Sequence, residues 1–251
     1  MNIYGCYALF IKELRRFYSV ILQTVGAPVV TALLYMAVFG QVLKGQTIEG
    51  VPGTAFLVPG LMMMSVIQNS FANTSSSFTQ SKVMGNLVFM LMTPLSPFEI
   101  YLAYTGAALV RGCLVAVVLF VVTHVFVSVP IMHPGLILVM LILSGGTLAV
   151  MGLIAGILAD KFDHLAAFQN FFIMPMSFLS GVFYSIHSLP PFWQQASYFN
   201  PFFYMIDGFR RGFFGVGDAS AIDAIAVAAG FFTLVSAIAI WMLARGFRIR
   251  S

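Results

Sequence analysis

Charged side chains are scarce in this sequence. The 12 Lys and Arg and the 8 Asp and Glu make up 8% of its 251 residues, whereas a typical soluble domain has about a quarter. Hydrophobic residues make up 60%, and the mean hydropathy is +0.98. So few charges cannot cover a water-exposed surface of this size. The composition therefore excludes a soluble globular protein.

Catalytic and nucleotide-binding motifs are also absent. The sequence has no HExxH, no GxSxG, no metal-spaced Cys/His set and no GxxxxGK[ST] phosphate loop. Without the last of these, the chain cannot by itself bind ATP as a P-loop protein does. The two cysteines, Cys6 and Cys113, lie in apolar surroundings typical of small packing residues. We expect no catalytic residue, no cofactor site and no metal site, and we interpret the cluster around Asp160 as a solvated turn.

Long apolar runs dominate the sequence instead. The first extends from Phe17 to Leu43 without a charged side chain, and five comparable stretches follow. A helix of about 20 apolar residues crosses a hydrocarbon core of roughly 30 Å. We therefore expect one all-α, polytopic membrane domain over residues 1–251. Its six transmembrane helices are expected at residues 19–42, 55–79, 101–127, 135–158, 165–184 and 224–244.

Three further segments are too polar or too short to cross. Residues 1–17 carry an apolar stripe at helical spacing opposite four charged residues, which predicts an interfacial amphipathic helix, or else a charged lead-in. Residues 81–99 are interrupted by glycine and proline, which predicts a loop with a short helix. Residues 186–215 predict an amphipathic helical hairpin, with Trp193 at the membrane boundary and Asn200-Pro201 starting its second helix.

The basic residues are distributed unevenly between the two sides. Six spans place both termini on one side, and with the termini inside, nine of the 12 Lys and Arg face the cytoplasm. The three outside are Lys44, Arg210 and Arg211, and Asp207 lies one helical turn before Arg211. The positive-inside rule therefore predicts cytoplasmic termini. Because the basic residues gather beside apolar helices, we expect membrane lipids as partners and no nucleic acid.

Several polar or small residues lie inside the expected spans, where hydrocarbon is an unfavourable environment for polar groups. Arg111 can extend towards the headgroups or point into the bundle. Gly152 and Gly156 permit close helix packing, either within the bundle or between subunits. The polar residues of the second span can line a path or form interhelical hydrogen bonds. They are Gln68, Asn69, Asn73, Ser76 and Ser77.

Three stretches carry a resemblance to a known family. They are VPGLMMMSVIQNSFANTSSSF (58–78), MLMTPLSPFEI (90–100) and SGVFYSIHSLPPFWQQASYFNPFFYMIDGFRRGFFG (180–215). In this order, between six apolar stretches, they resemble the integral membrane subunit of ABC-2 type exporters, and within that family the YadH-like branch. The resemblance covers essentially the whole chain.

The resemblance implies a permease of the bacterial inner membrane. Two copies, most simply a homodimer, would assemble with two separate ATPase subunits that bind Mg-ATP. The pair would export an amphipathic or lipid-linked molecule. A non-transporting scaffold and a lipid-modifying enzyme are the alternatives. In family terms, residues 81–99 hold the coupling helix that docks on the ATPase, and spans one, two and five border the path.

The resemblance also implies roles for individual residues. The stretch before the TPLSP loop lacks the acidic residues common in the family, so docking would depend on apolar side chains. The expected coupling residues are Lys82, Phe89, Met90, Leu91, Met92, Pro94, Pro97 and Glu99. The phenylalanines of the external hairpin would gate the outer exit or anchor the hairpin in the outer leaflet. The hairpin residues singled out are Phe192, Trp193, Asn200, Pro201, Asp207, Arg210 and Arg211.

Overall fold

The computed structural model describes residues 2–247, except for the side chain of Leu91. The fold is nearly all-α, as expected. A two-stranded antiparallel hairpin, β1 (Thr47–Ile48) with β2 (Val51–Pro52), is a small departure from it. The helices are α1 (Ile3–Ser19), α2 (Ile21–Val42), α3 (Gly53–Val83), α4 (Asn86–Met92), α5 (Pro97–His124), α6 (Pro134–Leu158), α7 (Phe162–Phe168), η1 (Gln169–Ile173), α8 (Met174–Phe178), η2 (Ile186–Ser188), α9 (Pro191–Tyr198), α10 (Pro201–Phe214) and α11 (Ala221–Arg245).

Five of these helices are long and apolar enough to cross a membrane: α2, α3, α5, α6 and α11. The expected span at residues 165–184 has a different form. Its helical run is α7, η1 and α8, of which η1 is a π-helical turn, and the run ends at Phe178. The next residues form turns because Gly181 adopts a positive φ of 71°. Only glycine adopts this conformation without strain.

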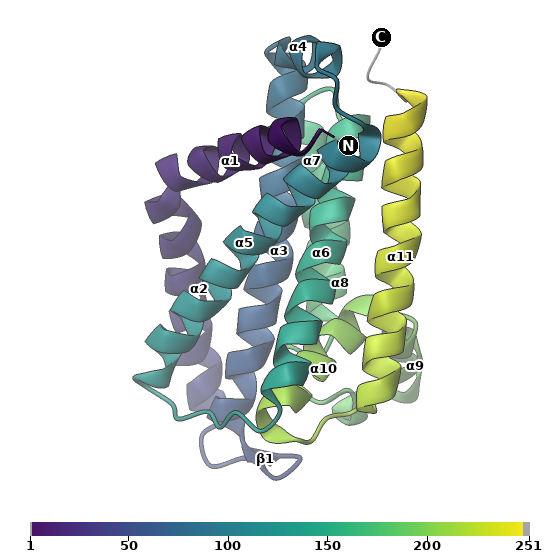
Figure 1. Cartoon of the computed structure of the whole chain (residues 1–251). Helices are drawn as coiled ribbons and strands as arrows, with labels where there is room; N and C mark the ends of the chain where they lie inside the picture. Colours follow the sequence, from purple (N-terminus) through teal and green to yellow (C-terminus); the bar gives the residue numbers. More distant parts are fainter. Residues whose placement is uncertain (1, 248–251) are drawn as a thin grey trace.

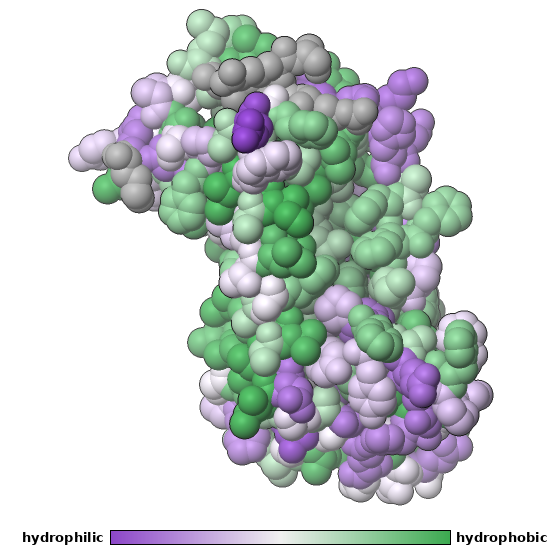
Figure 2. All heavy atoms as spheres, turned by 90° about the vertical axis from the view of Figure 1, so that its right-hand side faces the viewer, coloured by the Kyte–Doolittle hydropathy of each residue, from purple (hydrophilic) through white to green (hydrophobic). Residues whose placement is uncertain are grey.

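The long helices are arranged around α3 (Figure 1). In α3, 78% of the residues in the apolar stretch are buried by the rest of the chain, against 11% in α2. Helix α3 packs on α2, α5, α6 and α10. At one end of the molecule lie α1, α4 and the last turn of α11; we call this the α4 end. The β-hairpin, α9 and α10 lie at the other end, the hairpin end. Figure 2 shows apolar surface between polar residues gathered towards the two ends.

Helix α1 crosses the α4 end rather than running along the bundle (Figure 1). Its carboxylate Glu13 is buried beneath it, whereas Tyr4 and Tyr7 on another side are exposed. The first turn of α5 holds α1 in place, because Glu99 accepts hydrogen bonds from the backbone N–H of Asn2 and of Ser96. Ser96 in turn caps α5, which completes a capping box. These local caps start α5 four residues before the expected boundary.

Small residues let α3 and α6 approach closely. A Cβ on Gly152 would lie 2.2 Å from Thr74 Oγ1 and 2.4 Å from the carbonyl oxygen of Phe71. A Cβ on Gly156 would lie 2.9 Å from that of Phe78. Thr74 uses the proximity to donate a hydrogen bond to the carbonyl oxygen of Ala149 at 2.6 Å. The two glycines therefore serve packing within the bundle, the first of the two alternatives.

We expect Gly152→Ala to destabilise the protein by about 1–3 kcal/mol, because the added methyl group meets backbone that cannot move aside. The matched control is Gly230→Ala in α11, where a Cβ would meet nothing within 4 Å. The measurement is the temperature at which the detergent-solubilised protein loses its monodisperse peak. Equal transition temperatures for the two variants would contradict the packing described here.

Candidate functional site

A polar cavity of about 470 Å³ lies between α1, α2, α3 and α5, next to the π-helical turn η1. All five elements contribute polar side chains to its wall, which is unusual for a region so rich in apolar residues. Six of them are Arg16 from α1, Gln23 from α2, Gln68 and Asn69 from α3, Arg111 from α5 and Gln169 from η1. This is the candidate functional site, and we call it the polar cavity.

Two arginines meet over one asparagine at the wall of the polar cavity. Arg16 Nη2 donates to Asn73 Oδ1 at 3.1 Å and to the carbonyl oxygen of Asn73 at 2.8 Å. Arg111 Nη1 also donates to Asn73 Oδ1, at 3.3 Å, and its Nη2 donates to Asn69 Oδ1 at 3.0 Å. Amide oxygens of α3 therefore hold both guanidinium groups at the cavity.

Arg111 thus points into the bundle, and the interpretation that it extends to the headgroups is wrong. The physical reason is that α3 offers amide oxygens within hydrogen-bond distance of Arg111, which satisfy part of a guanidinium that would otherwise be buried without partners.

The five polar residues singled out on α3 do not all face the same way. Gln68, Asn69 and Ser76 line the polar cavity. Asn73 is buried next to the cavity wall, and its side-chain oxygen accepts hydrogen bonds from Arg16 and Arg111. Ser77 is buried beside Tyr104 of α5, away from the cavity. The first four form one polar face of the helix, and the fifth belongs to its packing against α5.

Sequence reasoning missed the residues that other elements bring to the polar cavity. Gln23 and Thr24 are polar side chains near the start of an otherwise apolar span, and Gln169 lies within the expected fifth span. Each is a polar residue at membrane depth, and this signal could have marked all three. The π-helical turn at Gln169 could not have been predicted, although such turns often occur at functional sites.

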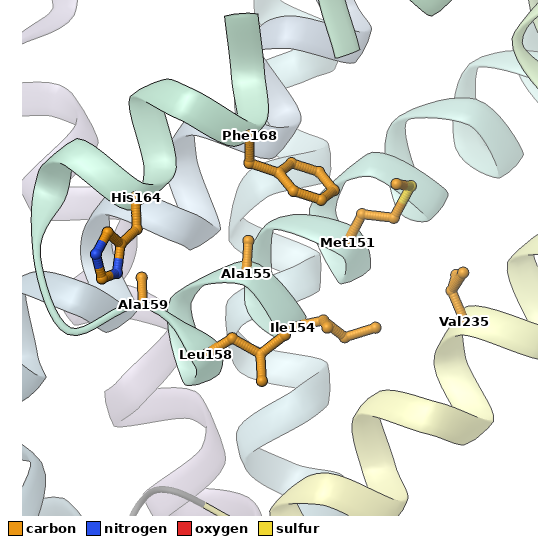
Figure 3. Close-up of a pocket in the computed structure, with 8 residues that line it drawn as sticks. All are labelled: Met151, Ile154, Ala155, Leu158, Ala159, His164, Phe168 and Val235. Carbon is orange, nitrogen blue, oxygen red and sulfur yellow. The ribbon is translucent and has the colours of Figure 1, made fainter. Parts of the chain in front are cut away.

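A second cavity, of about 230 Å³, lies between α6, α7 and α11 (Figure 3). Its walls are apolar, with Met151, Ile154 and Val235 on facing helices, and His164 stands at the α7 side. His164 lies next to the turn at Asp160, and its ring accepts from the backbone N–H of Asp160 at 3.5 Å. The cavity offers no cluster of polar groups for chemistry.

The short helix α4 exposes apolar side chains at the end of the bundle. Phe89 is 71% exposed and Met92 78%, whereas Leu87 is buried and Met90 packs against the core. Pro94 is exposed in the loop that follows, and Pro97 is the first residue of α5. The side chain of Leu91 lies outside the described part of the structure.

The two charged residues expected to contact the partner are engaged within the chain. Lys82 Nζ lies 2.7 Å from Asp160 Oδ1 and donates to the carbonyl oxygens of Ile157 and Ala159 at 3.2 Å. It therefore ties the end of α3 to the end of α6. Glu99 is buried and caps α5, as described above. The surface of α4 that remains for a partner is mostly apolar.

At the hairpin end, α10 is more buried than its amphipathic pattern predicts. Its stripe of Phe202, Phe209 and Phe213 packs inside the chain, as does Phe203, while Phe192, Trp193 and Phe199 in and next to α9 are exposed. Asn200 caps α10 just before Pro201, because its side chain accepts a hydrogen bond from the backbone N–H of Phe202. The same side chain donates to the carbonyl oxygen of Met176 at 2.8 Å. The hairpin is therefore anchored to the end of α8.

Asp207 and Arg211 lie four residues apart on α10, but Asp207 pairs with Arg210 instead. Asp207 Oδ1 lies 3.6 Å from Nη1 of Arg210, which is 2% exposed. Arg210 also donates to the carbonyl oxygen of Gly181 at 2.6 Å and lies over the ring of Phe56, 3.8 Å from its centroid. Arg211 donates instead to the carbonyl oxygen of Ala219 at 2.8 Å. The apolar stripe of α10 faces the interior of the protein, and Arg210 is buried together with it.

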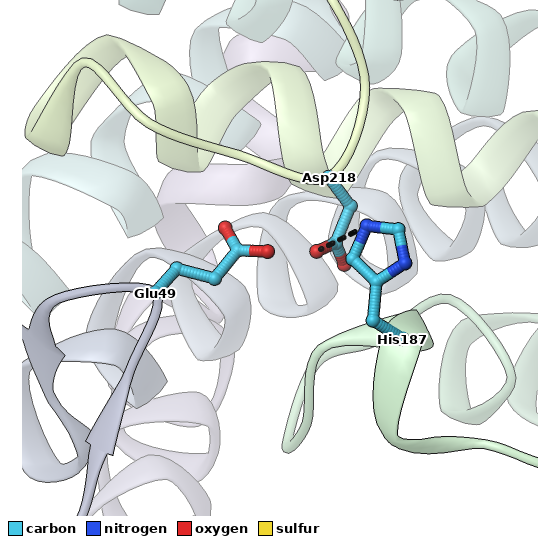
Figure 4. Close-up of side chains that lie close together, drawn as sticks. All are labelled: Glu49, His187 and Asp218. Carbon is cyan, nitrogen blue, oxygen red and sulfur yellow. Dashed lines mark ion pairs between the residues drawn. The ribbon is translucent and has the colours of Figure 1, made fainter.

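Two carboxylates and a histidine from three separate segments meet at the hairpin end (Figure 4). Glu49 of the β-hairpin, His187 of η2 and Asp218 before α11 have ligand atoms within 4.8 Å of one another, a spacing that one cation could bridge. His187 Nε2 lies 3.7 Å from Asp218 Oδ1. Ser185 Oγ lies between the two carboxylates, 2.6 Å from Asp218 Oδ1 and 3.4 Å from Glu49 Oε1, so the three segments meet in one polar cluster.

Comparison with the sequences of known proteins identifies the family of this chain. The family model described as ABC-2 type transporter matches residues 4–214. The chain belongs to the ABC-2 type transporter family. It is 34% identical over 246 residues to the inner membrane transport permease YadH of Escherichia coli, which covers 97% of this chain and 96% of that protein. It is 27% identical over 186 residues to nodulation protein J of Sinorhizobium fredii, with 72% and 70% covered.

Membership in the ABC-2 type family, with the five apolar helices, identifies a multi-pass protein of the inner membrane and a transport permease. YadH is named as a transport permease, which is consistent with the expectation of a transport subunit that is not an enzyme. The polar cavity and the surface of α4 are thus features of a permease.

We expect the stability of this ABC-2 type permease to fall as the pH rises from about 5 to 8. The hydrogen bond to Asp218 raises the pKa of Glu49 to about 7, and partial burial and the charges of Asp218 and Asp207 act in the same direction. A carboxyl group with a raised pKa stabilises the fold below its ordinary pKa, and this is lost as the pH rises through the higher value. Arg210 and His187 also lie near the pair.

The measurement is the unfolding temperature at pH 5.5 and pH 8, with EDTA present to remove any bridging cation. Glu49→Gln keeps a hydrogen-bond donor towards Asp218 but cannot ionise, so its unfolding temperature should change less between the two pH values. A wild-type change no larger than that of Glu49→Gln would contradict the raised pKa of Glu49.

Proposed function

We propose that this chain is the permease subunit of an exporter that moves an amphipathic or lipid-linked molecule across the inner membrane. A separate ATPase subunit, present in two copies, hydrolyses Mg-ATP, and a second copy of this chain completes the permease. The observation that carries the proposal is α4, a short helix that presents Phe89 and Met92 beyond the ends of the long helices. A permease without a nucleotide-binding motif needs such a surface to receive the energy of ATP.

The topology supports docking on the cytoplasmic side. The start of α1 and the end of α11 both lie at the α4 end, which requires an even number of crossings (Figure 1). We take α7, η1 and α8, with the turns that follow, as the sixth crossing. The α4 end then carries Arg15, Arg16 and Arg245, and the positive-inside rule places it in the cytoplasm.

The connection between α4 and the polar cavity supports a coupling role. Helix α4 follows α3 after Met84 and Gly85, and Gly85 has a φ of 75°. Helix α3 in turn carries the polar face that lines the cavity. A force on α4 is therefore applied to the end of a rigid helix that reaches the cavity. ATP binding would shift the population of two arrangements of the helices through this contact.

The exposed surface of α2 supports a second copy. Only 11% of the residues in its apolar stretch are buried by this chain, and α2 also forms part of the wall of the polar cavity. A second permease packed against this side would enclose the path between the two copies. The alternative of a lipid-modifying enzyme would need acid and base groups that converge, whereas the polar cavity has arginines and amides.

We expect Phe89→Asp, alone or with Met92→Asp, to abolish binding of the ATPase, because a carboxylate cannot enter an apolar groove without losing its hydration. The control is Phe126→Asp, a change at a phenylalanine that is 67% exposed, compared with 71% for Phe89, in the loop after α5 at the hairpin end. The measurements are co-purification of the ATPase and ATP-dependent export of an amphipathic reporter from proteoliposomes. Full co-purification and export with Phe89→Asp would refute the proposal.

A further inference from the structure

We propose that the polar cavity binds an anionic phosphate group through Arg111, with Arg16 and Gln68 as further donors. The inference rests on the proposed function, because it takes the polar cavity as part of the transport path, and it narrows the cargo to amphiphiles that carry a phosphate. The same chemistry is offered by a lipid headgroup and by free phosphate, and the test below separates these sources.

The charge around the polar cavity is not balanced. Among the residues that the structure describes, no carboxylate forms an ion pair with Arg111. Its side-chain hydrogen bonds go to the neutral amides of Asn69 and Asn73, and its guanidinium lies 5.9 Å from the ring centroid of Phe17. Arg16 shares Glu13 with Lys12, at 3.4 Å and 2.8 Å. A charge that is partly buried without a counter-charge is unfavourable. An anion in the cavity would supply the missing negative charge.

The unpartnered hydrogen-bonding groups at this site point to the same ligand. Arg111 Nε, Gln68 Nε2 and Asn73 Nδ2 are buried and have no hydrogen-bond partner. All three are N–H donors, and the first two belong to residues that line the cavity. Buried donors are nearly always paired in native proteins. A ligand that only accepts hydrogen bonds, such as a phosphate, satisfies a site with this excess of donors.

The shape of the cavity fits a headgroup with an attached chain. Its volume of about 470 Å³ lies within the usual range for small-ligand pockets and is too small for a whole lipid. Val20, just before α2, and Ala27 and Pro28 in α2 form an apolar part of the wall of the same cavity. Because α2 is little covered by the chain, the tail of an amphiphile can leave along its surface. Arg111 would then hold the phosphate while the tail stays in the hydrocarbon.

The test uses the purified permease without the ATPase. Native mass spectrometry measures the binding of phosphatidylglycerol and of diacylglycerol, which has the same tails and no phosphate, and a parallel series adds inorganic phosphate as competitor. We expect the wild type to bind phosphatidylglycerol more tightly than diacylglycerol, and Arg111→Gln to weaken phosphatidylglycerol binding by about tenfold or more, since hydrogen bonds to charged groups are worth about that factor. Arg15→Gln, at an exposed neighbour of Arg16, removes the same charge and should bind like the wild type.

Gln68→Leu is the second variant, because it removes an unpartnered donor and breaks no hydrogen bond of that amide nitrogen. It should weaken phosphatidylglycerol binding several-fold even if Arg111→Gln does not fold. Competition by inorganic phosphate would identify a site for the free anion as well, and no competition would identify a headgroup site. Equal binding of both lipids by the wild type, or equal losses in Arg111→Gln and Arg15→Gln, would overturn the proposal. Neither result would affect co-purification of the ATPase.

Discussion

A polar group in hydrocarbon must find its partners within the protein, and this constraint shapes the whole molecule. Helix α3 is the longest of the five apolar helices and the one richest in amides and hydroxyls. The chain encloses it between α2, α5, α6 and α10. Against α6 the enclosure is tight, because Gly152 lets Thr74 reach a carbonyl oxygen of the neighbouring helix. Towards α2 it is incomplete, and there the polar cavity lies.

The two ends of the bundle use buried and exposed groups in opposite ways. At the hairpin end, Arg210 and Asp207 are buried together, and Arg210 donates a hydrogen bond to the carbonyl oxygen of Gly181 in the turn after α8. Charged groups there close the structure around the end of α8. At the α4 end, charged groups such as Lys82 and Glu99 are engaged within the chain, while Phe89 and Met92 remain exposed. The charged groups of the hairpin end therefore stabilise the fold, whereas the α4 end exposes an apolar surface suited to a partner.

Much of this fold follows from the sequence, because a run of about 20 apolar residues has few alternatives to a membrane-crossing helix. Helix boundaries were less predictable, since they depend on caps such as Ser96 with Glu99. Helix α8 ends at Phe178, and the turns after it include a positive φ at Gly181 and a hydrogen bond from Arg210, which is distant in sequence. Which face of α10 is buried, and which neighbour Arg111 meets, are tertiary facts that periodicity does not contain. The polar face of α3 was predictable, but which residues of the other helices lie opposite it was not.

Cysteine accessibility tests most directly whether the polar face of α3 lines a water-filled cavity. After Cys6 and Cys113 are replaced by alanine, single cysteines are placed at Ser65, which lines the polar cavity, and at Leu34, which is exposed on α2. A water-soluble maleimide is then added to open membrane fragments, where only a thiol in contact with water ionises and reacts. The structure predicts rapid reaction at position 65 and none at position 34. Reaction at neither position, or at equal rates, would contradict it.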